Sequence, residues 1–113
     1  MATRIYHNPK CSTSRKTLDL LRENGIEPEV VQYLKTPPTR AELVAMIKDA
    51  GIDVRTAVRK RESLYAELNL ADATDEQLLD AMAEHPILIE RPFVVTAKGT
   101  RLARPIDAVR EIL

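Results

Sequence analysis

A chain of 113 residues is the size of one compact domain, and 44% hydrophobic residues suffice for a single core. Lys and Arg number 17, as do Asp and Glu, and this zero net charge argues against broad electrostatic binding of nucleic acid or an anionic membrane. Neither the roughly 20-residue apolar run of a membrane helix nor the apolar core of a signal peptide is found. We therefore expect a cytoplasmic protein whose thiols stay reduced.

The first third of the chain predicts a strand, a helix and a second strand. RIYH (residues 4–7) favours a strand, and Pro9 ends it. Leucines three residues apart predict a helix over residues 12–24. EVVQY (residues 29–33) is typical of a second strand, so this part predicts a right-handed βαβ unit with a parallel strand pair.

The middle of the chain predicts three helices. A Thr-x-x-Glu capping box at Thr39 opens the first, and Asp53 caps a short second one. A Thr-x-x-Gln box at Thr74 opens the third, over residues 74–85, and Pro86 ends it.

The last part of the chain predicts a hairpin and a closing helix. The apolar run FVVT and the later RLA lie within residues 87–103, and Gly99 supplies the turn between them. IDAVREIL (residues 106–113) aligns its apolar residues on one face and predicts a helix. The order strand, helix, strand, three helices, two strands, helix predicts one α/β domain over residues 1–113.

Cys11 is the only cysteine, and the pattern places it at the start of the first helix. Helix N-termini carry partial positive charge and unpaired N–H groups, which favour a thiolate and also bind oxyanions. Lys10, Arg15 and Lys16 add positive charge nearby. The pattern therefore favours an activated nucleophile in an anion-binding loop, and the alternative is a partly buried structural cysteine in a polar turn.

Two known types of cysteine loop are tested by their spacing. A phosphatase loop needs Arg six residues after the cysteine, where this chain has Thr17. A dithiol loop needs Cys-x-x-Cys, and here the fourth residue is Ser14, so only a monothiol version remains. The Ser14 hydroxyl could donate a hydrogen bond to the thiolate but could not resolve a disulfide.

Two histidines are considered with the cysteine. His7, four residues before Cys11, either steadies the thiolate or satisfies local hydrogen bonds. His7, Cys11 and His85 have poor spacing for metal ligands, so we expect no metal site.

Three arginines lie away from the loop: Arg59, Arg91 and Arg104. An arginine can hold an oxyanion through its planar fork, although a solvated face or a salt bridge is the ordinary role. We expect exposed side chains whose replacement barely changes stability. Pro92 directly precedes a predicted strand, where a cis peptide can hold a tight bend beside a site, although a trans proline is the commoner case.

The chain resembles the glutaredoxin-dependent arsenate reductase family of the thioredoxin superfamily. The matching segments are IYHNPKCSTSRKTL, YLKTPPTRAEL, VRTAVRKRE, HPILIERPFVVT and GTRLARP, which run in order over nearly the whole chain. The resemblance implies an α/β thioredoxin-like fold, with a mixed four-stranded sheet in the order 2-1-3-4 and an inserted helical segment.

The resemblance also implies a role for each matched residue. Cys11 matches the nucleophilic cysteine and His7 its neighbouring histidine, with Ser14 in support. Arg59, Arg91 and Arg104 match the three oxyanion-binding arginines, and Pro92 matches the cis proline. With the position of Pro92 before FVVT, this match leads us to predict that the Arg91–Pro92 peptide is cis.

The implied reaction is the reduction of arsenate through a covalent thiol–arsenic adduct at Cys11. Glutathione is then a co-substrate that attacks the arsenic, glutaredoxin removes the glutathionyl group, and arsenite leaves. We expect no bound cofactor, a monomer, and no nucleic-acid or membrane partner.

Two other functions remain open. The first is a glutathione-dependent thiol reductase that acts on another substrate. The second is a redox-sensing regulator that binds RNA polymerase, a branch of the same fold that typically has Cys-x-x-Cys in this loop. Ser14 and the retained arginines argue against the regulator.

Overall fold

The computed structural model describes residues 2–113, and this part of the chain divides into two compact units. One unit comprises the chain up to Thr36 together with Arg91–Leu113, and the other is Pro37–Glu90. The expectation of a single domain over residues 1–113 stays a prediction.

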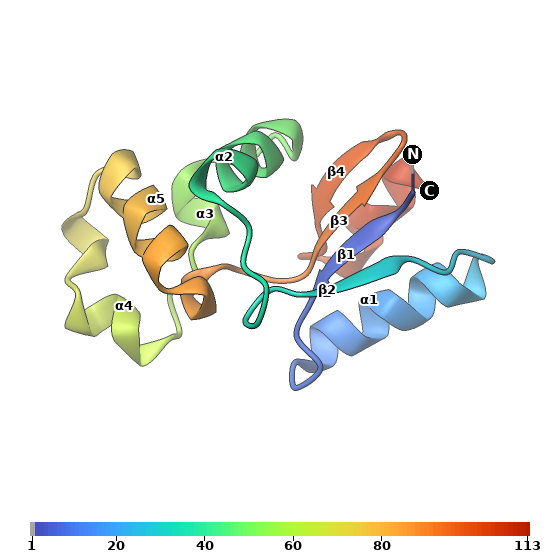
Figure 1. The fold of residues 1–113 in the computed structure, drawn as a ribbon, viewed down its shortest axis with the longest axis horizontal. Coiled ribbons are helices and arrows are strands. Elements are labelled where there is room, and N and C mark those ends of the chain that lie inside the picture. Colours follow the sequence, from blue (N-terminus) through green and yellow to red (C-terminus); the bar gives the residue numbers. More distant parts are fainter. Residues whose placement is uncertain (1) are drawn as a thin grey trace. The chain divides into compact units, whose positions relative to one another are not determined.

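A four-stranded mixed sheet forms the centre of the first unit (Figure 1). Its strand order is β2-β1-β3-β4, with β1 parallel to β2, and β3 antiparallel to both β1 and β4. This confirms the predicted order 2-1-3-4. The strands are β1 (Arg4–His7), β2 (Glu29–Gln32), β3 (Phe93–Thr96) and β4 (Gly99–Leu102).

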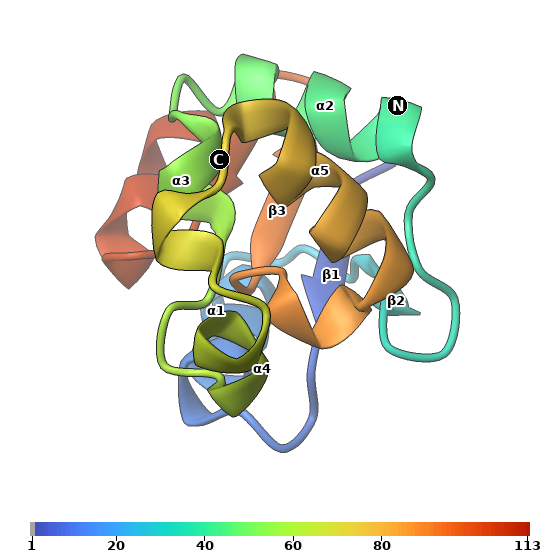
Figure 2. The ribbon, with the colours of Figure 1, turned by 90° about the vertical axis from the view of Figure 1, so that its left-hand side faces the viewer.

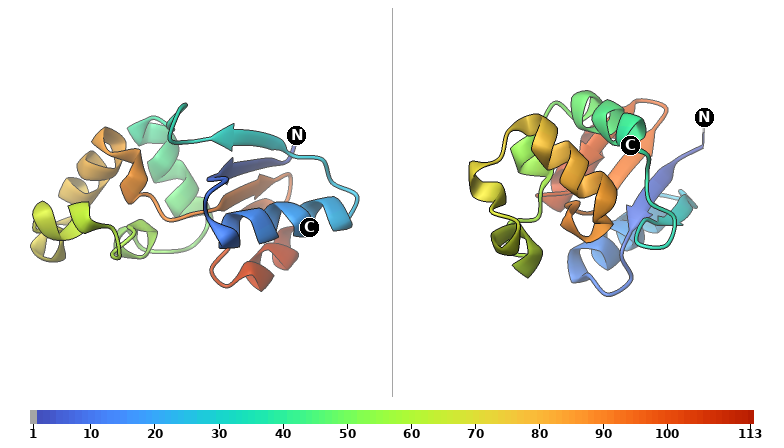
Figure 3. Two further views of the ribbon diagram at one scale, coloured as in Figure 1. Left: turned by 90° about the horizontal axis from the view of Figure 1, so that it is seen from below. Right: turned by 60° about the vertical axis from the view of Figure 1, so that its left-hand side comes forward.

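Two helices, α1 (Ser12–Glu23) and η3 (Ile106–Ile112), cover one face of this sheet (Figure 3, left). They share one apolar core with β1 and β3, and each fully buried Leu or Val in it contributes about 1.5–3 kcal/mol. The closing helix is a 3₁₀-helix, which the apolar pattern did not distinguish from an α-helix. The buried residues of this shared core are Ile5, Leu18, Leu20, Leu21, Val94, Ala103, Val109 and Ile112.

The strand register decides which loops share one end of the sheet. Phe93 pairs with Tyr6 on one side and with Leu102 on the other. Arg91, just before β3, and Arg104, just after β4, therefore lie at the end of the sheet where β1 runs into its following loop. That loop carries Cys11.

The second unit is helical, and α2 and α5 lie side by side in it (Figure 2). Arg40 of α2 donates hydrogen bonds to Glu76 and Asp80 of α5. Both predicted capping boxes, at Thr39 and Thr74, are confirmed. The elements are α2 (Arg40–Asp49), α3 (Val54–Ala57), α4 (Ser63–Glu67), η1 (Leu70–Asp72), α5 (Asp75–Glu84) and η2 (Pro86–Leu88).

The prediction of three helices in this segment is wrong, because α4 and two short 3₁₀-helices were not predicted. The helix α4 spans five residues, buries none of them, and has no side-chain cap at Glu62. Periodicity and capping are the signals that reveal a helix in a sequence, and α4 carries neither. Asn69, which follows it, adopts the left-handed conformation (φ 53°), which Asn tolerates better than most residues.

Candidate active site

Cys11 is the N-cap residue of α1, at the point where the loop after β1 becomes helical. Its backbone is extended (φ −96°, ψ 122°), and its carbonyl accepts the first helical hydrogen bond from the N–H of Arg15 at 3.0 Å. The sulfur therefore lies at the helix end where backbone N–H groups have no helical partner, as predicted from the sequence.

The electrostatic surroundings of Cys11 favour a thiolate. Burial raises the pKa of its thiol, but hydrogen bonds from the backbone N–H of Ser14, the Arg91 side chain and the backbone N–H of Thr13 lower it. Together with the positive charge of Arg91, they leave the pKa below its usual value. A larger fraction of Cys11 is thus nucleophilic at neutral pH than in a free cysteine.

Arg91 and Arg104 converge on this sulfur. Arg104 places Nη2 3.8 Å from Cys11 Sγ and donates through Nε to the carbonyl oxygen of Arg91 at 3.0 Å. The Arg91 side chain hydrogen-bonds Cys11, while its buried Nε and Nη1 have no hydrogen-bond partner among the described residues. Two unpartnered N–H donors beside a nucleophile can donate hydrogen bonds to the oxygens of an anion.

The expectation that these arginines are exposed is wrong for Arg91, which is 7% exposed. The side chain is buried because its residue lies between the start of β3 and the Cys11 loop at the crowded end of the sheet. Arg59 and Arg104 are half-buried.

Ser14 is fully buried, and its hydroxyl is used inside the loop. Ser14 Oγ lies 2.6 Å from His7 Nδ1 and accepts a hydrogen bond from the N–H of Asn8 at 3.0 Å. The group of Ser14 that reaches the thiol is its backbone N–H. Burial, with the charges of Arg22 and Arg15, lowers the pKa of His7, so its ring is neutral at pH 7.

The Arg91–Pro92 peptide is cis, which confirms the prediction made for it. The Arg104–Pro105 peptide is also cis, and this was not predicted. Pro105 directly precedes the predicted closing helix rather than a strand, so the signal used for Pro92 was absent here.

Arg59 belongs to the second unit, in the segment after α3. Its backbone N–H donates to the carbonyl of Leu88 at 2.7 Å, beside the isolated bridge between Val58 and Ile89. Its guanidinium pairs with Glu62 through Nε and with Glu90 through Nη1, each at 3.4 Å. The side chain is thus fixed by backbone and carboxylates of its own unit.

Residues 2–113 contain no group of three His, Cys, Asp or Glu side chains arranged to hold a metal ion. His85, considered as a ligand from the sequence, lies 3.9 Å from Glu84. Within the same residues, no helix combines the length and the apolar character needed to cross a membrane.

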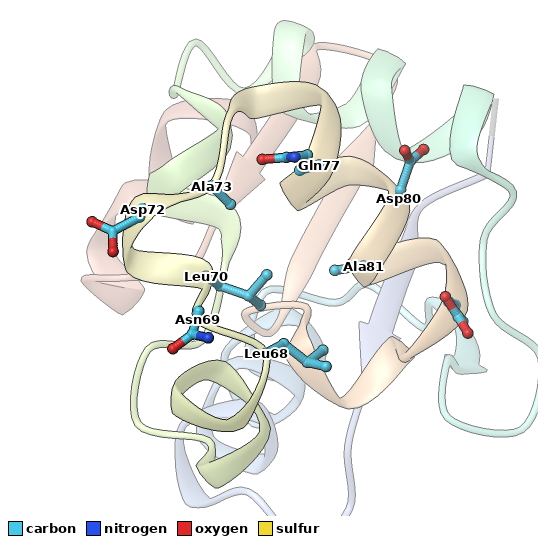
Figure 4. Close-up of a pocket in the computed structure, with 9 residues that line it drawn as sticks. Leu68, Asn69, Leu70, Asp72, Ala73, Gln77, Asp80 and Ala81 are labelled. Carbon is cyan, nitrogen blue, oxygen red and sulfur yellow. The ribbon is translucent and has the colours of Figure 1, made fainter.

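A surface pocket of about 440 Å³ lies between the segment from Leu68 to Ala73 and helix α5 (Figure 4). It holds none of the residues predicted to act on a substrate. Asp72, Asp80 and Glu84 line it, and three carboxylates repel an oxyanion. This pocket is therefore unsuited to binding an oxyanion.

Asn8 is the residue that the sequence analysis missed at this site. It is buried, and its backbone and side chain hydrogen-bond three parts of the Cys11 loop. Asn8-Pro9 is a common turn signal, and that was the available sign.

Comparison with known proteins matches residues 6–112 to the model of the ArsC family. An arsenate reductase of Rhizobium meliloti (strain 1021) is 60% identical over 115 residues, covering 100% of this chain and 82% of that protein. A solved structure, arsenate reductase from Vibrio cholerae, has a TM-score of 0.94 and 51% identity, covering 100% of this chain and 98% of that one. An uncharacterized protein of Escherichia coli (strain K12), YfgD, is 50% identical over 113 residues, covering 97% of this chain and 95% of that protein.

Proposed function

Since this chain belongs to the ArsC family, we propose that it is an arsenate reductase that uses the thiol of Cys11. The observation that carries the proposal is the Cys11 sulfur itself, held at a helix N-terminus with Arg91 and Arg104 beside it. A nucleophile among cationic donors suits an anionic electrophile, because the donors offset the repulsion between a thiolate and an oxyanion.

In the first step the Cys11 thiolate attacks the arsenic of arsenate. A sulfur–arsenic bond forms, an arsenate oxygen leaves as water after it is protonated, and arsenic remains pentavalent. Arg91 and Arg104 donate N–H groups to the remaining oxygens, and the α1 N-terminus adds partial positive charge.

The chain has one cysteine, so the two reducing electrons come from external thiols. Glutathione attacks the arsenic of the adduct and displaces a second oxygen as water. The thiolate of glutaredoxin then attacks the glutathionyl sulfur, and the electron pair of that sulfur–arsenic bond stays on arsenic, which becomes trivalent. Water then attacks the trivalent arsenic and displaces the Cys11 thiolate, so arsenite leaves and Cys11 is regenerated. Glutaredoxin carries away the glutathione as a mixed disulfide.

Arg59 is the third arginine of the proposed oxyanion site. Its two ion pairs engage Nε and Nη1, so Nη2 is the nitrogen that neither pair uses. We assign His7 and Ser14 supporting roles in the loop and Pro92 a structural role. No bound cofactor or metal enters the reaction, and the protein acts as a monomer in the cytoplasm.

A coupled assay tests the proposal. The purified protein is mixed with arsenate, glutathione, glutaredoxin, glutathione reductase and NADPH, and NADPH oxidation is followed at 340 nm. We expect oxidation that needs every component and that disappears in Cys11→Ser. NADPH oxidation that proceeds equally without arsenate contradicts the proposal.

The relative YfgD keeps the alternative of a thiol reductase with another substrate in view, since its length matches this chain more fully and its function is not named. The same coupled assay with a glutathionylated peptide in place of arsenate separates the two functions. Retention of RNA polymerase on the immobilised protein would support the third function, the regulator.

A further inference from the structure

Asn8 joins three separate parts of the active-site loop. Its N–H donates to Ser14 Oγ, its side-chain Oδ1 accepts from the N–H of Lys10, and its carbonyl accepts from the N–H of Cys11, each at 3.0 Å. The residue is 6% exposed. One buried side chain and its backbone thus connect the end of β1, the nucleophile and the first turn of α1.

The side chain matters because its backbone neighbours cannot replace it. Pro9 has no N–H, so the N–H of Lys10 is the next donor in the loop, and Asn8 Oδ1 accepts it in an Asx turn. Alanine at position 8 would leave that N–H without its acceptor and remove one of the three connections. The loop before Cys11 would then sample more conformations.

We propose that Asn8 is a positioning residue that holds the Cys11 sulfur where the backbone N–H groups of Ser14 and Thr13 reach it. This deepens the proposed function and rests on it in taking Cys11 as the nucleophile. The charged groups that face the sulfur are Arg91 and Arg104, and Arg104 also donates to the carbonyl of Arg91.

The expected consequence follows from two opposing effects on the thiol. Burial raises the pKa of Cys11, and the N–H groups and Arg91 lower it. If the loop loosens, the N–H groups lose alignment while the burial remains. The pKa of Cys11 then rises, and the thiolate fraction at neutral pH falls.

The test measures the rate of Cys11 alkylation by iodoacetamide against pH in three variants. Asn8→Ala removes the acceptor, and Asn8→Ser restores a shorter, uncharged one. Asn24→Ala is the matched control, because Asn24 donates to the carbonyl of Leu20 at 2.8 Å at the far end of the same helix. Thermal unfolding is recorded for each variant.

We expect Asn8→Ala to raise the pH midpoint of alkylation by about one unit, and so to lower the rate at pH 7 by up to about tenfold. Asn8→Ser should recover part of this, and Asn24→Ala should match the wild type. An unchanged pH midpoint in both Asn8 variants overturns the inference, even if stability falls. If Asn8→Ala does not fold, Asn8→Ser alone decides. Alkylation needs no arsenate. If the protein does not reduce arsenate, the alkylation data therefore still test the role of Asn8.

Discussion

Cys11 is held between burial, which disfavours its charge, and a set of N–H and guanidinium donors, which favour it. Arg91 illustrates what this arrangement costs, because its own Nε and Nη1 are buried without hydrogen-bond partners in the described residues. Such groups are expensive in a folded protein unless a ligand completes them. At the scale of the residue, the candidate site therefore places the Cys11 thiol beside two unpartnered N–H donors of Arg91, which the oxygens of a bound anion would complete.

The first prediction concerns the pH dependence of Cys11. Its pKa is lowered in the folded state, so the thiolate should form below the value of about 8.5 for a free cysteine and be lost as pH falls through the lowered value. The alkylation rate should thus rise with pH with a midpoint below pH 8.5. A midpoint at 8.5 or above would contradict an activated thiol.

The second prediction separates activity from stability at the two arginines. Arg91→Met should lower kcat/KM for arsenate about a hundredfold, the loss of roughly 3 kcal/mol of charge stabilisation. It should also raise the free energy of unfolding by about 1 kcal/mol, because unpartnered buried donors are replaced by an apolar chain of similar size.

Arg104→Met is the matched comparison. It should lower kcat/KM similarly but reduce the free energy of unfolding by about 1 kcal/mol, because it loses the hydrogen bond to the Arg91 carbonyl. Lysine at either position should recover part of the activity, since charge survives but the fork does not. Urea titration that shows the same sign for both methionine variants would refute this contrast.

At the scale of the element, α1 and the two capped helices begin in different ways. Helices α2 and α5 start with complete capping boxes, whereas α1 starts at the thiol of Cys11. The two capping boxes stabilise the fold, because they provide hydrogen-bond partners for N–H groups in the first turn of each helix. At α1 the backbone N–H groups of the first turn instead reach the Cys11 sulfur, and in the proposed reaction they also face an anion.

The third prediction tests this division of roles. Thr39→Ala and Thr74→Ala should each lower the free energy of unfolding by about 1 kcal/mol through loss of the cap. Both variants should keep normal kcat/KM for arsenate. The control is Thr36→Ala, an exposed threonine outside any helix, which should change neither quantity. Loss of activity in a cap variant that remains folded would argue against the separation.

At the scale of the whole molecule, the residues proposed for the oxyanion site are divided between the two compact units. Cys11, Arg91 and Arg104 belong to one, and Arg59 belongs to the other. Arg59 is fixed inside its own unit by Glu62, Glu90 and the backbone of Leu88. A role for Arg59 in catalysis therefore requires the two units to act together on one substrate.

The fourth prediction tests that requirement. Arg59→Ala should lower kcat/KM for arsenate about a hundredfold, while alkylation of Cys11 in the absence of arsenate stays normal. Arg61→Ala, an exposed arginine two residues away, is the control and should be neutral. Normal arsenate reduction by Arg59→Ala would show that Arg59 takes no part in the reaction. It would not affect the roles proposed for Arg91 and Arg104.

The fifth prediction concerns the single domain expected over residues 1–113. If the units fold cooperatively, urea unfolding should give one transition that coincides for far-UV circular dichroism and tyrosine fluorescence. Two separated transitions would show that the units unfold independently.

Local chemistry explains what the sequence by itself determined. The order of the principal elements, the capping boxes at Thr39 and Thr74, and the place of Cys11 at a helix start all depend on residues within one turn of each other. The family resemblance extended this to the strand order 2-1-3-4 and, with the strand that follows Pro92, to the cis peptide before it. Short uncapped segments such as α4 were not predicted, because they carry no periodic apolar face.

Tertiary structure alone decided what surrounds the sulfur. The pairing of Phe93 with Tyr6 and Leu102 brings Arg91 and Arg104 to Cys11, although Arg104 is 93 residues away along the chain. Burial of Arg91 and the use of the Ser14 hydroxyl by His7 and Asn8 also follow from that packing. A sequence pattern records which donors exist, but desolvation and hydrogen-bond partners depend on the groups that the strand register places together.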